Sequence, residues 1–114
     1  MAIGAQSLYS NTTGGNSTAV GYQAGYNNNA GGNTFVGDSA GYGVTTGNYN
    51  TAIGYYALQA NTTASNNTAV GYQAGYSNTT GTANAFFGSS AGATNTTGNR
   101  NTYAGNYAGN GMVT

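Results

Sequence analysis

The stretch Thr68–Asn84 reads Thr-Ala-Val-Gly-Tyr-Gln-Ala-Gly-Tyr-Ser-Asn-Thr-Thr-Gly-Thr-Ala-Asn, and variants of it fill the 114-residue chain. The glycine of its Ala-Val-Gly step recurs at Gly4, Gly21, Gly37, Gly54, Gly71, Gly88 and Gly105. The intervals between these glycines are 17, 16, 17, 17, 17 and 17 residues. A fixed period of this size is typical of solenoids, in which each repeat stacks on the next. We therefore expect a single repeat domain, residues 1–114, with coils that start near residues 1, 18, 34, 51, 68, 85 and 102.

The residues of each repeat favour β-structure over helix. Glycine recurs every four to five residues in the apolar part of the repeat, and each glycine costs about 1 kcal/mol relative to alanine inside a helix. We expect two short strands per coil, near Thr68–Val70 and Tyr72–Tyr76, separated by a bend at Gly71 and followed by a polar loop. Coils stacked about 4.8 Å apart would join these strands into parallel sheets. The predicted fold is an all-β parallel β-solenoid.

The loop is located by the single short interval. One residue is missing between Tyr26 and Asn33, and a deletion is tolerated in a surface loop but reverses the faces of a strand. The same part of the repeat carries Asn-Thr-Thr-Gly at Asn11, Asn78 and Asn95, a composition typical of turns. Asparagine also precedes most of the first strands, and we expect it to form hydrogen bonds between coils.

Two apolar columns follow from the alignment of the repeats. The third position is Ile3, Val20, Val36, Ile53, Val70, Phe87 and Ala104, and we expect it to form the core beside the small seventh position, mostly alanine. The second position is Ala2, Ala19, Phe35, Ala52, Ala69, Phe86 and Tyr103, and strand periodicity turns it to the opposite face. One chain offers about one large aliphatic residue per coil, including Val113 in the last, which is a thin core. A second apolar face needs a partner, so we expect several copies, most simply three around a common axis.

Composition excludes several classes of function. The chain has no His, Cys, Glu or Lys, and its charged residues are Asp38 and Arg100, which lie several coils apart and cannot pair within one chain. General acid–base catalysis and the usual metal sites need residues that are missing, so we expect no enzyme, no cofactor and no metal. A net charge of zero provides no basic surface for nucleic acid. We find no apolar run long enough to insert into a membrane and no signal peptide or anchor in this segment.

Two strings of the repeat resemble known fibre proteins. Asn-Thr-Ala-Ile-Gly (Asn50–Gly54) and Asn-Thr-Ala-Val-Gly (Asn67–Gly71) are similar to the head repeats of YadA-like trimeric autotransporter adhesins. The longer string Asn67–Gly81 resembles the long-repeat shafts of phage tail fibres and bacterial surface fibres, since the adhesin unit is shorter and lacks the extra loop. The resemblance implies a left-handed β-roll, a homotrimer, and an extracellular, cell-surface or virion location.

Tyrosine forms the most conspicuous candidate recognition surface. Aromatic rings stack on sugars, and the tyrosines that recur in two columns are candidates for surface recognition: Tyr22, Tyr55 and Tyr72 in one, and Tyr26, Tyr42 and Tyr76 in the other. The alternative is that these rings pack against neighbouring coils. N-glycosylation sequons also occur, as expected by composition in a chain rich in Asn and Thr.

Together these features predict a structural or adhesive segment of a trimeric fibre, a rigid spacer that contacts host-surface carbohydrate or a protein receptor. The alternative is an ice-binding β-solenoid that uses ladders of Thr and Asn. Against this alternative, the repeat has no Thr-x-Thr on one strand, because its Thr-Thr pairs lie in the loop.

Overall fold

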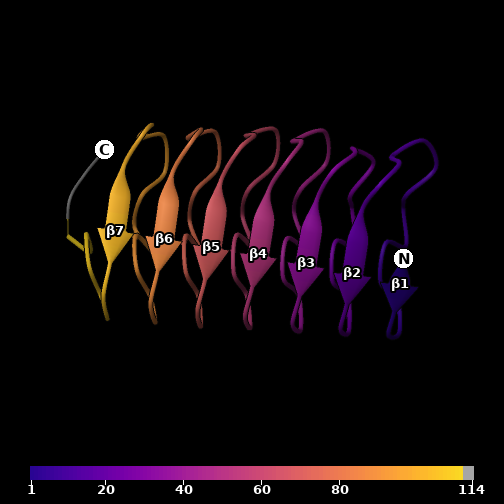
Figure 1. Ribbon diagram of the computed structural model, residues 1–114, viewed down its shortest axis with the longest axis horizontal. Helices are drawn as coiled ribbons and strands as arrows, with labels where there is room; N and C mark the ends of the chain where they lie inside the picture. The colour runs from indigo at the N-terminus through magenta and orange to yellow at the C-terminus, as the bar shows by residue number, and fades with distance from the viewer. Residues whose placement is uncertain (112–114) are drawn as a thin grey trace.

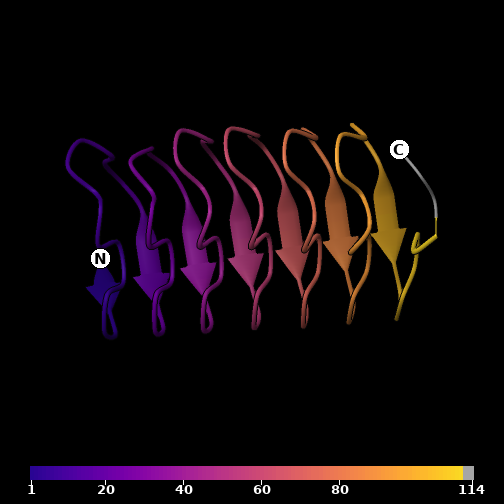
Figure 2. The same ribbon diagram turned by 180° about the vertical axis from the view of Figure 1, so that it is seen from behind.

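The computed structural model describes residues 1–111, which form an all-β parallel β-solenoid of about six turns, 36 × 20 × 16 Å in extent. Each coil contributes one short strand: β1 (Ala2–Ile3), β2 (Thr18–Val20), β3 (Thr34–Val36), β4 (Thr51–Ile53), β5 (Thr68–Val70), β6 (Ala85–Phe87) and β7 (Thr102–Ala104). The strands stand side by side in chain order in one parallel sheet, with the remainder of each coil looping behind it (Figures 1 and 2). The solenoid predicted from the repeat period is confirmed. Val113, which we assigned to the core of the last coil, lies outside the described residues.

The strands pair in strict register with the sequence repeat. Thr51 stands beside Thr68, Ala52 beside Ala69, and Ile53 beside Val70, and the other strand pairs follow the same pattern. Each strand has its middle residue buried and its flanking residues partly or fully exposed from β2 onward. The sheet therefore has one buried face, which carries the second position of each repeat.

Our assignment of the core to the third position is wrong. Ile3, Ile53 and Phe87 are 54, 39 and 43% exposed, whereas Phe35 and Phe86 of the second column are fully buried. Alternation along a strand shows that the two columns face opposite ways, but it does not show which face is inside. The interior is narrow because the buried alanines of the seventh position line it, and it admits the second column, which is mostly alanine, rather than a continuous column of Val and Ile.

The second predicted strand, near Tyr72–Tyr76, is also wrong, because this segment is a tight turn. Gln73 and Gly75 have φ angles of 53° and 61°, in the left-handed region that no strand residue occupies. Equivalent residues in the other coils share these positive φ angles. The turn still bonds to its neighbours, since Gln73 N donates to Tyr55 O at 2.9 Å and Gly75 N donates to Ala91 O at 2.9 Å.

The glycine that defines the repeat has a physical role in stacking. Gly54 has a φ of 132°, and a Cβ added to it would lie 2.5 Å from the carbonyl oxygen of Gly71 in the next coil. Gly71 is in the same relation to Gly88. Only glycine combines this backbone conformation with so close an approach, so this column allows coils to stack at strand spacing.

Asparagine fixes the far end of each coil, as the sequence predicted. The side chain of Asn67 is fully buried: its Oδ1 accepts from Asn84 N at 2.9 Å, and its Nδ2 donates to Gly81 O at 2.8 Å. Asn50 and Asn84 make the same pair of bonds in their coils. The one-residue deletion lies between β2 and β3, in a segment without strand, which confirms its assignment to a loop.

Large side chains fill the core from two sides in alternation. The ring of Phe35 lies between Gly25 and Gly41, and that of Phe86 lies between Gly75 and Gly92, so close that a Cβ at any of these glycines would overlap it. In the coils whose strands carry Ala19 and Ala69, a leucine of the preceding coil enters from the turn instead. Cδ2 of Leu58 lies 2.9 Å from the position of a Cβ on Gly75, and Leu8 has the same relation to Gly25.

This alternation reveals a longer repeat of three coils. Residues 18–26 and 68–76 are identical, and the residues of the core recur in the same order, with Leu8 and Leu58 followed by Phe35 and Phe86. The buried or partly buried large apolar residues that fill successive layers are Leu8, Phe35, Val44, Leu58, Phe86 and Tyr103. The thin core predicted from composition is thus a core of about one large side chain per layer.

Candidate functional surfaces

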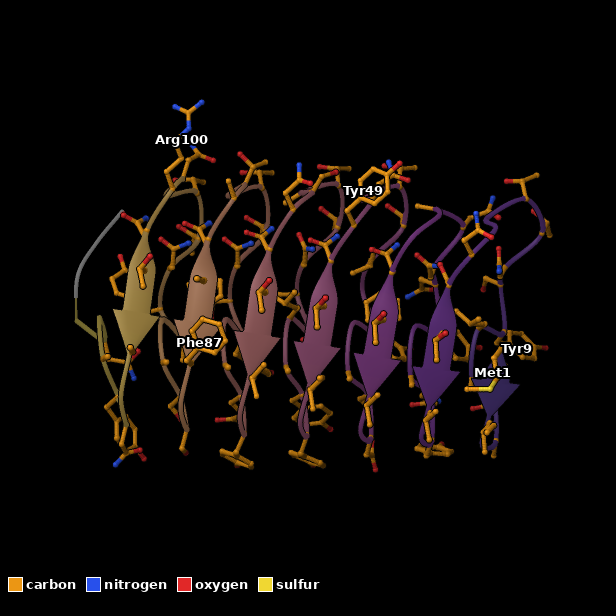
Figure 3. All side chains as sticks on the ribbon, viewed as in Figure 1. Met1, Tyr9, Tyr49, Phe87 and Arg100 are labelled. Atoms are coloured by element: carbon orange, nitrogen blue, oxygen red, sulfur yellow. The ribbon has the colours of Figure 1, made fainter. Side chains whose placement is uncertain are left out.

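The outward face of the sheet carries an unbroken apolar stripe. We define the apolar stripe as the third-position residues of the first six coils: Ile3, Val20, Val36, Ile53, Val70 and Phe87. All are partly or largely exposed, and the ring of Phe87 lies over β6 in Figure 3. Strand pairing places each stripe residue beside the next, so the stripe runs along the rod from β1 to β6. A contiguous exposed apolar surface is typical of an interaction site.

A threonine column lies on the same face as the stripe. Thr18, Thr34, Thr51 and Thr68 are two residues before the stripe residues of their strands and are partly exposed. Residues two apart on a strand share a face. The outward sheet face is therefore a regular, uncharged array of Thr and Val or Ile, which sequence reasoning missed because we placed the third position inside.

One predicted tyrosine column is a stacked ladder. Tyr26 lies between Tyr9 and Tyr42, with ring centroids 5.1 Å apart on both sides and interplanar angles of 9° and 17°. Each inner ring face is therefore covered by its neighbour, as the packing alternative predicted. Tyr76, three repeats after Tyr26 along the chain, is separate from this ladder. Its ring centroid lies 6.1 Å from that of Tyr56, with the two rings tilted by 55°.

The second predicted tyrosine column is interrupted. Tyr55 and Tyr72 stack at 5.6 Å with an interplanar angle of 5°, and both are largely exposed. Tyr22 belongs to the same column, but Asp38 occupies the coil between it and Tyr55. A hydrogen bond between the phenols of Tyr55 and Tyr56 raises the pKa of Tyr55 to about 12, and the negative charge of Asp38 contributes in the same direction.

The sequons differ in accessibility. Asn61, Asn78 and Asn95 are buried, and their carboxamides are hydrogen bonded to the carbonyl oxygens of their own turns. Asn16 and Asn66 are exposed at turn positions with φ angles of 58° and 63°. Burial thus removes three of the predicted sequons from contact with any modifying enzyme.

The surface of the described residues carries two charged side chains, Asp38 and Arg100. Residues 1–111 contain no group of three or more His, Cys, Asp or Glu side chains that could hold a metal ion, and no pocket opens on their surface. Arg100 projects from the loop edge, the upper edge in Figure 3. No helix suited to crossing a membrane occurs in the part of the chain that the structure describes.

Comparison with known proteins returned no match to a protein-family model, a curated protein or a solved structure. The fold and these surfaces are therefore the basis for any assignment of function.

Proposed function

We propose that the chain is a rigid, non-enzymatic segment of an extracellular fibre, bacterial or phage, in which three copies pack together through the apolar stripe. The observation that carries this proposal is the stripe itself, which runs along the rod without a charged residue. Fully burying a Val or Ile side chain stabilises an assembly by about 1.5–3 kcal/mol. Six partly exposed side chains in a row thus provide a strong drive for association. The resemblance to trimeric fibre repeats supports the number three and the left-handed coil.

A rod of this kind has the properties that a spacer needs. Backbone hydrogen bonds join each coil to the next at many points, for example Thr51 N to Asn67 O at 2.9 Å and Gly54 N to Val36 O at 2.7 Å. Because every coil repeats the same bonds, the segment resists bending along its length. Recognition of host glycans is a second part of the proposal. It rests on the exposed tyrosines, above all Tyr22, Tyr55 and Tyr72, which are 51, 42 and 51% exposed.

The assembly is tested by measuring its mass. Size-exclusion chromatography with light scattering should give about 34 kDa, three times the chain mass of 11.3 kDa. Changing Val36 and Ile53 to lysine should yield a folded monomer, because a lysine in the buried stripe is an unpaired charge. The matched control changes Thr63 and Thr97, exposed loop residues, to lysine and should leave the trimer intact. A native chain that is monomeric and well folded at all concentrations contradicts the proposal.

An ice-binding solenoid is the second candidate, and one observation favours it. The outward face presents Thr and Val or Ile in register on successive strands, so the lack of Thr-x-Thr no longer excludes a regular water-ordering face. Microscopy of single ice crystals during slow cooling separates the candidates. Ice crystals that become faceted with the native chain but not with the Thr34→Lys/Thr51→Lys variant would support ice binding. Round, freely growing ice crystals with the native chain would exclude ice binding and favour the fibre proposal.

A further inference from the structure

Three pairs of tyrosine rings are stacked between successive coils. Tyr26 stacks on Tyr9 and on Tyr42, in both cases with ring centroids 5.1 Å apart and with interplanar angles of 9° and 17°. Tyr55 stacks on Tyr72 at 5.6 Å and 5°. The backbone carbonyl groups of all these residues except Tyr9 accept hydrogen bonds from a neighbouring coil. The backbone of the rod therefore holds the rings of each pair in contact.

The stacked rings are accessible to reagents in solution. Tyr9, Tyr55 and Tyr72 are 65, 42 and 51% exposed, and the other two rings are partly exposed. The chain contains no Trp and no Cys, the side chains that compete with tyrosine for one-electron oxidation. A radical formed on one of these tyrosines therefore has no Trp or Cys of the same chain to which it could pass.

We propose that the stacked tyrosines are sites of oxidative cross-linking, at which a peroxidase and hydrogen peroxide join the two rings of a pair as dityrosine. The oxidant removes one electron and one proton from each of the two phenols, and the peroxide is reduced to two molecules of water. The two phenoxyl radicals form a carbon–carbon bond between the ring positions next to their oxygen atoms. Each of these carbons then gives up its hydrogen, through solvent, to the oxygen of its own ring. The product is two phenols joined by one bond, with two hydrogen atoms fewer than the original pair.

Stacking selects these tyrosines because it places the second ring beside the first before either is oxidised. Radicals on separate chains must collide in solution, whereas a stacked partner is held in contact and couples as soon as it too is oxidised. Tyr22, Tyr49 and Tyr107 are 51, 68 and 62% exposed but contact no aromatic ring of residues 1–111. Contact rather than exposure should therefore determine which tyrosines couple.

A bond of this kind would join neighbouring coils covalently. The chain has no Cys, so no disulfide can do so. The members of the stacked pairs are 17, 16 and 17 residues apart along the chain, and a cross-link that closes such a loop restricts the unfolded state. The cross-linked rod should thus resist unfolding better than the native rod. This inference does not depend on association through the apolar stripe.

Treatment of the folded chain with peroxidase and hydrogen peroxide at low protein concentration tests the proposal. The native chain should gain dityrosine fluorescence and lose two hydrogen atoms in mass for each bond formed, while remaining a single 11.3 kDa chain on a denaturing gel. Its midpoint of unfolding in urea should rise. Proteolysis and mass spectrometry should identify Tyr26 joined to Tyr9 or Tyr42, or Tyr55 joined to Tyr72.

Two triple variants separate contact from exposure. Tyr26→Phe/Tyr55→Phe/Tyr56→Phe leaves no two tyrosines in ring contact among residues 1–111, because Tyr56 is the remaining partner of Tyr76. Phenylalanine keeps the rings, so the circular dichroism spectrum should remain that of the folded chain, while the fluorescence gained should fall about tenfold or more. The matched control Tyr22→Phe/Tyr49→Phe/Tyr107→Phe removes as many tyrosines, none of them stacked, and should react as the native chain does.

Three results would overturn the proposal. Equal fluorescence gain in the two triple variants would show that exposure, not contact, selects the tyrosines. Cross-linked product that runs only as dimers on a denaturing gel, in proportion to protein concentration, would show that coupling joins separate chains. A native chain that loses no hydrogen atoms in mass under these conditions would show that the stacked rings do not couple.

Discussion

The two ways of filling a core layer should be interchangeable, and a double-mutant cycle on Leu58 and Ala69 measures this. Leu58 fills the layer between the fourth and fifth coils from the turn side, while Ala69 stands opposite on β5. In the layer between the second and third coils the same space is filled from the strand side by Phe35, with Gly25 at the leucine position. The double change Leu58→Gly/Ala69→Phe converts the first arrangement into the second.

Each single change should destabilise the fold. Leu58 is fully buried, and removing a buried leucine side chain costs about 2–5 kcal/mol. Its φ of 51° favours glycine, but the greater freedom of glycine in the unfolded chain offsets that gain. Ala69→Phe alone places a ring in the space that Leu58 occupies, and such overpacking costs about 1–3 kcal/mol. The losses in the free energy of unfolding of the two single variants should therefore add to about 3–8 kcal/mol.

The double variant should cost much less than this sum. The new ring would lie between glycines at positions 58 and 75, as Phe35 lies between Gly25 and Gly41. It would also lie beside Phe86, as Phe86 lies beside Tyr103 with ring centroids 5.9 Å apart. A swap that conserves volume in a core costs under about 1.5 kcal/mol, so the coupling energy should be at least about 1.5 kcal/mol.

Urea unfolding followed by circular dichroism, with all variants at one protein concentration, provides the free energies. The control Leu58→Gly/Ala19→Phe puts the ring in a different layer and should show no coupling. If the losses of Leu58→Gly and Ala69→Phe add to within about 0.5 kcal/mol in the double variant, the two residues do not share a space and our account of the core is refuted.

Three further predictions concern the stacking glycine, the asparagine column and the tyrosine pair. Gly54→Ala should lower the free energy of unfolding in urea by about 2–5 kcal/mol, because its Cβ would overlap the next coil and its φ of 132° excludes alanine. Gly15→Ala, with open space around it, should be neutral or slightly stabilising. Asn67→Ala breaks two buried hydrogen bonds and should lower the free energy of unfolding by about 2–4 kcal/mol. Asn106→Ala, at an exposed position, should have little effect, and equal effects of the two changes would contradict the role of the asparagine column. Tyr55 titrates near pH 12, above its ordinary value of 10.0, so the stability it contributes is complete below pH 10 and is lost as the pH rises from 10 through 12. Near-ultraviolet absorbance titration of Tyr55→Phe should lack this late phenolate step, and Tyr56→Phe should move it down toward pH 10.

The sequence was sufficient for the features that depend on the repeat period. The spacing of the glycines predicts the number of coils and their stacking, and the missing residue after Tyr26 locates the loop correctly. Asparagine before each strand was also a sound guide, because a buried carboxamide can bond both within its coil and to the next.

Two features could not be read from alternation alone. Val70 and Ala69 point to opposite sides of β5, and β propensity favoured the wrong one as the core residue. The informative signal was a compensation in size between the eighth position of one coil and the second position of the next. Glycine at 25 or 75 is followed by phenylalanine at 35 or 86, and leucine at 8 or 58 is followed by alanine at 19 or 69. Such compensation occurs only between residues that share an interior.

The turn at Gln73 shows a different limit. Its Gly-Tyr-Gln-Ala-Gly-Tyr sequence alternates as a strand would, yet Gln73 adopts a left-handed φ that residues other than glycine seldom take. The backbone bonds from Gln73 N and Gly75 N to the coils on either side hold it there. A conformation imposed by neighbouring coils has no signature within the segment itself.

The three-coil order of the core also limits how such a rod can change its length when repeats are lost from its gene. Removing residues 18–33 alone would bring Phe35 against Leu8, and removing residues 68–84 alone would bring Phe86 against Leu58. Removing residues 34–50 alone would leave Gly25 facing Ala52, with no large side chain between them. Losing the fifty residues from 18 to 67 instead places Leu8 beside Gly75, on a coil whose strand carries Ala69, which copies its native place beside Gly25, on a coil whose strand carries Ala19. The loss of three coils therefore conserves the core, whereas the loss of the second, third or fifth coil alone disrupts it, so the packing of single side chains limits which lengths such a rod can adopt.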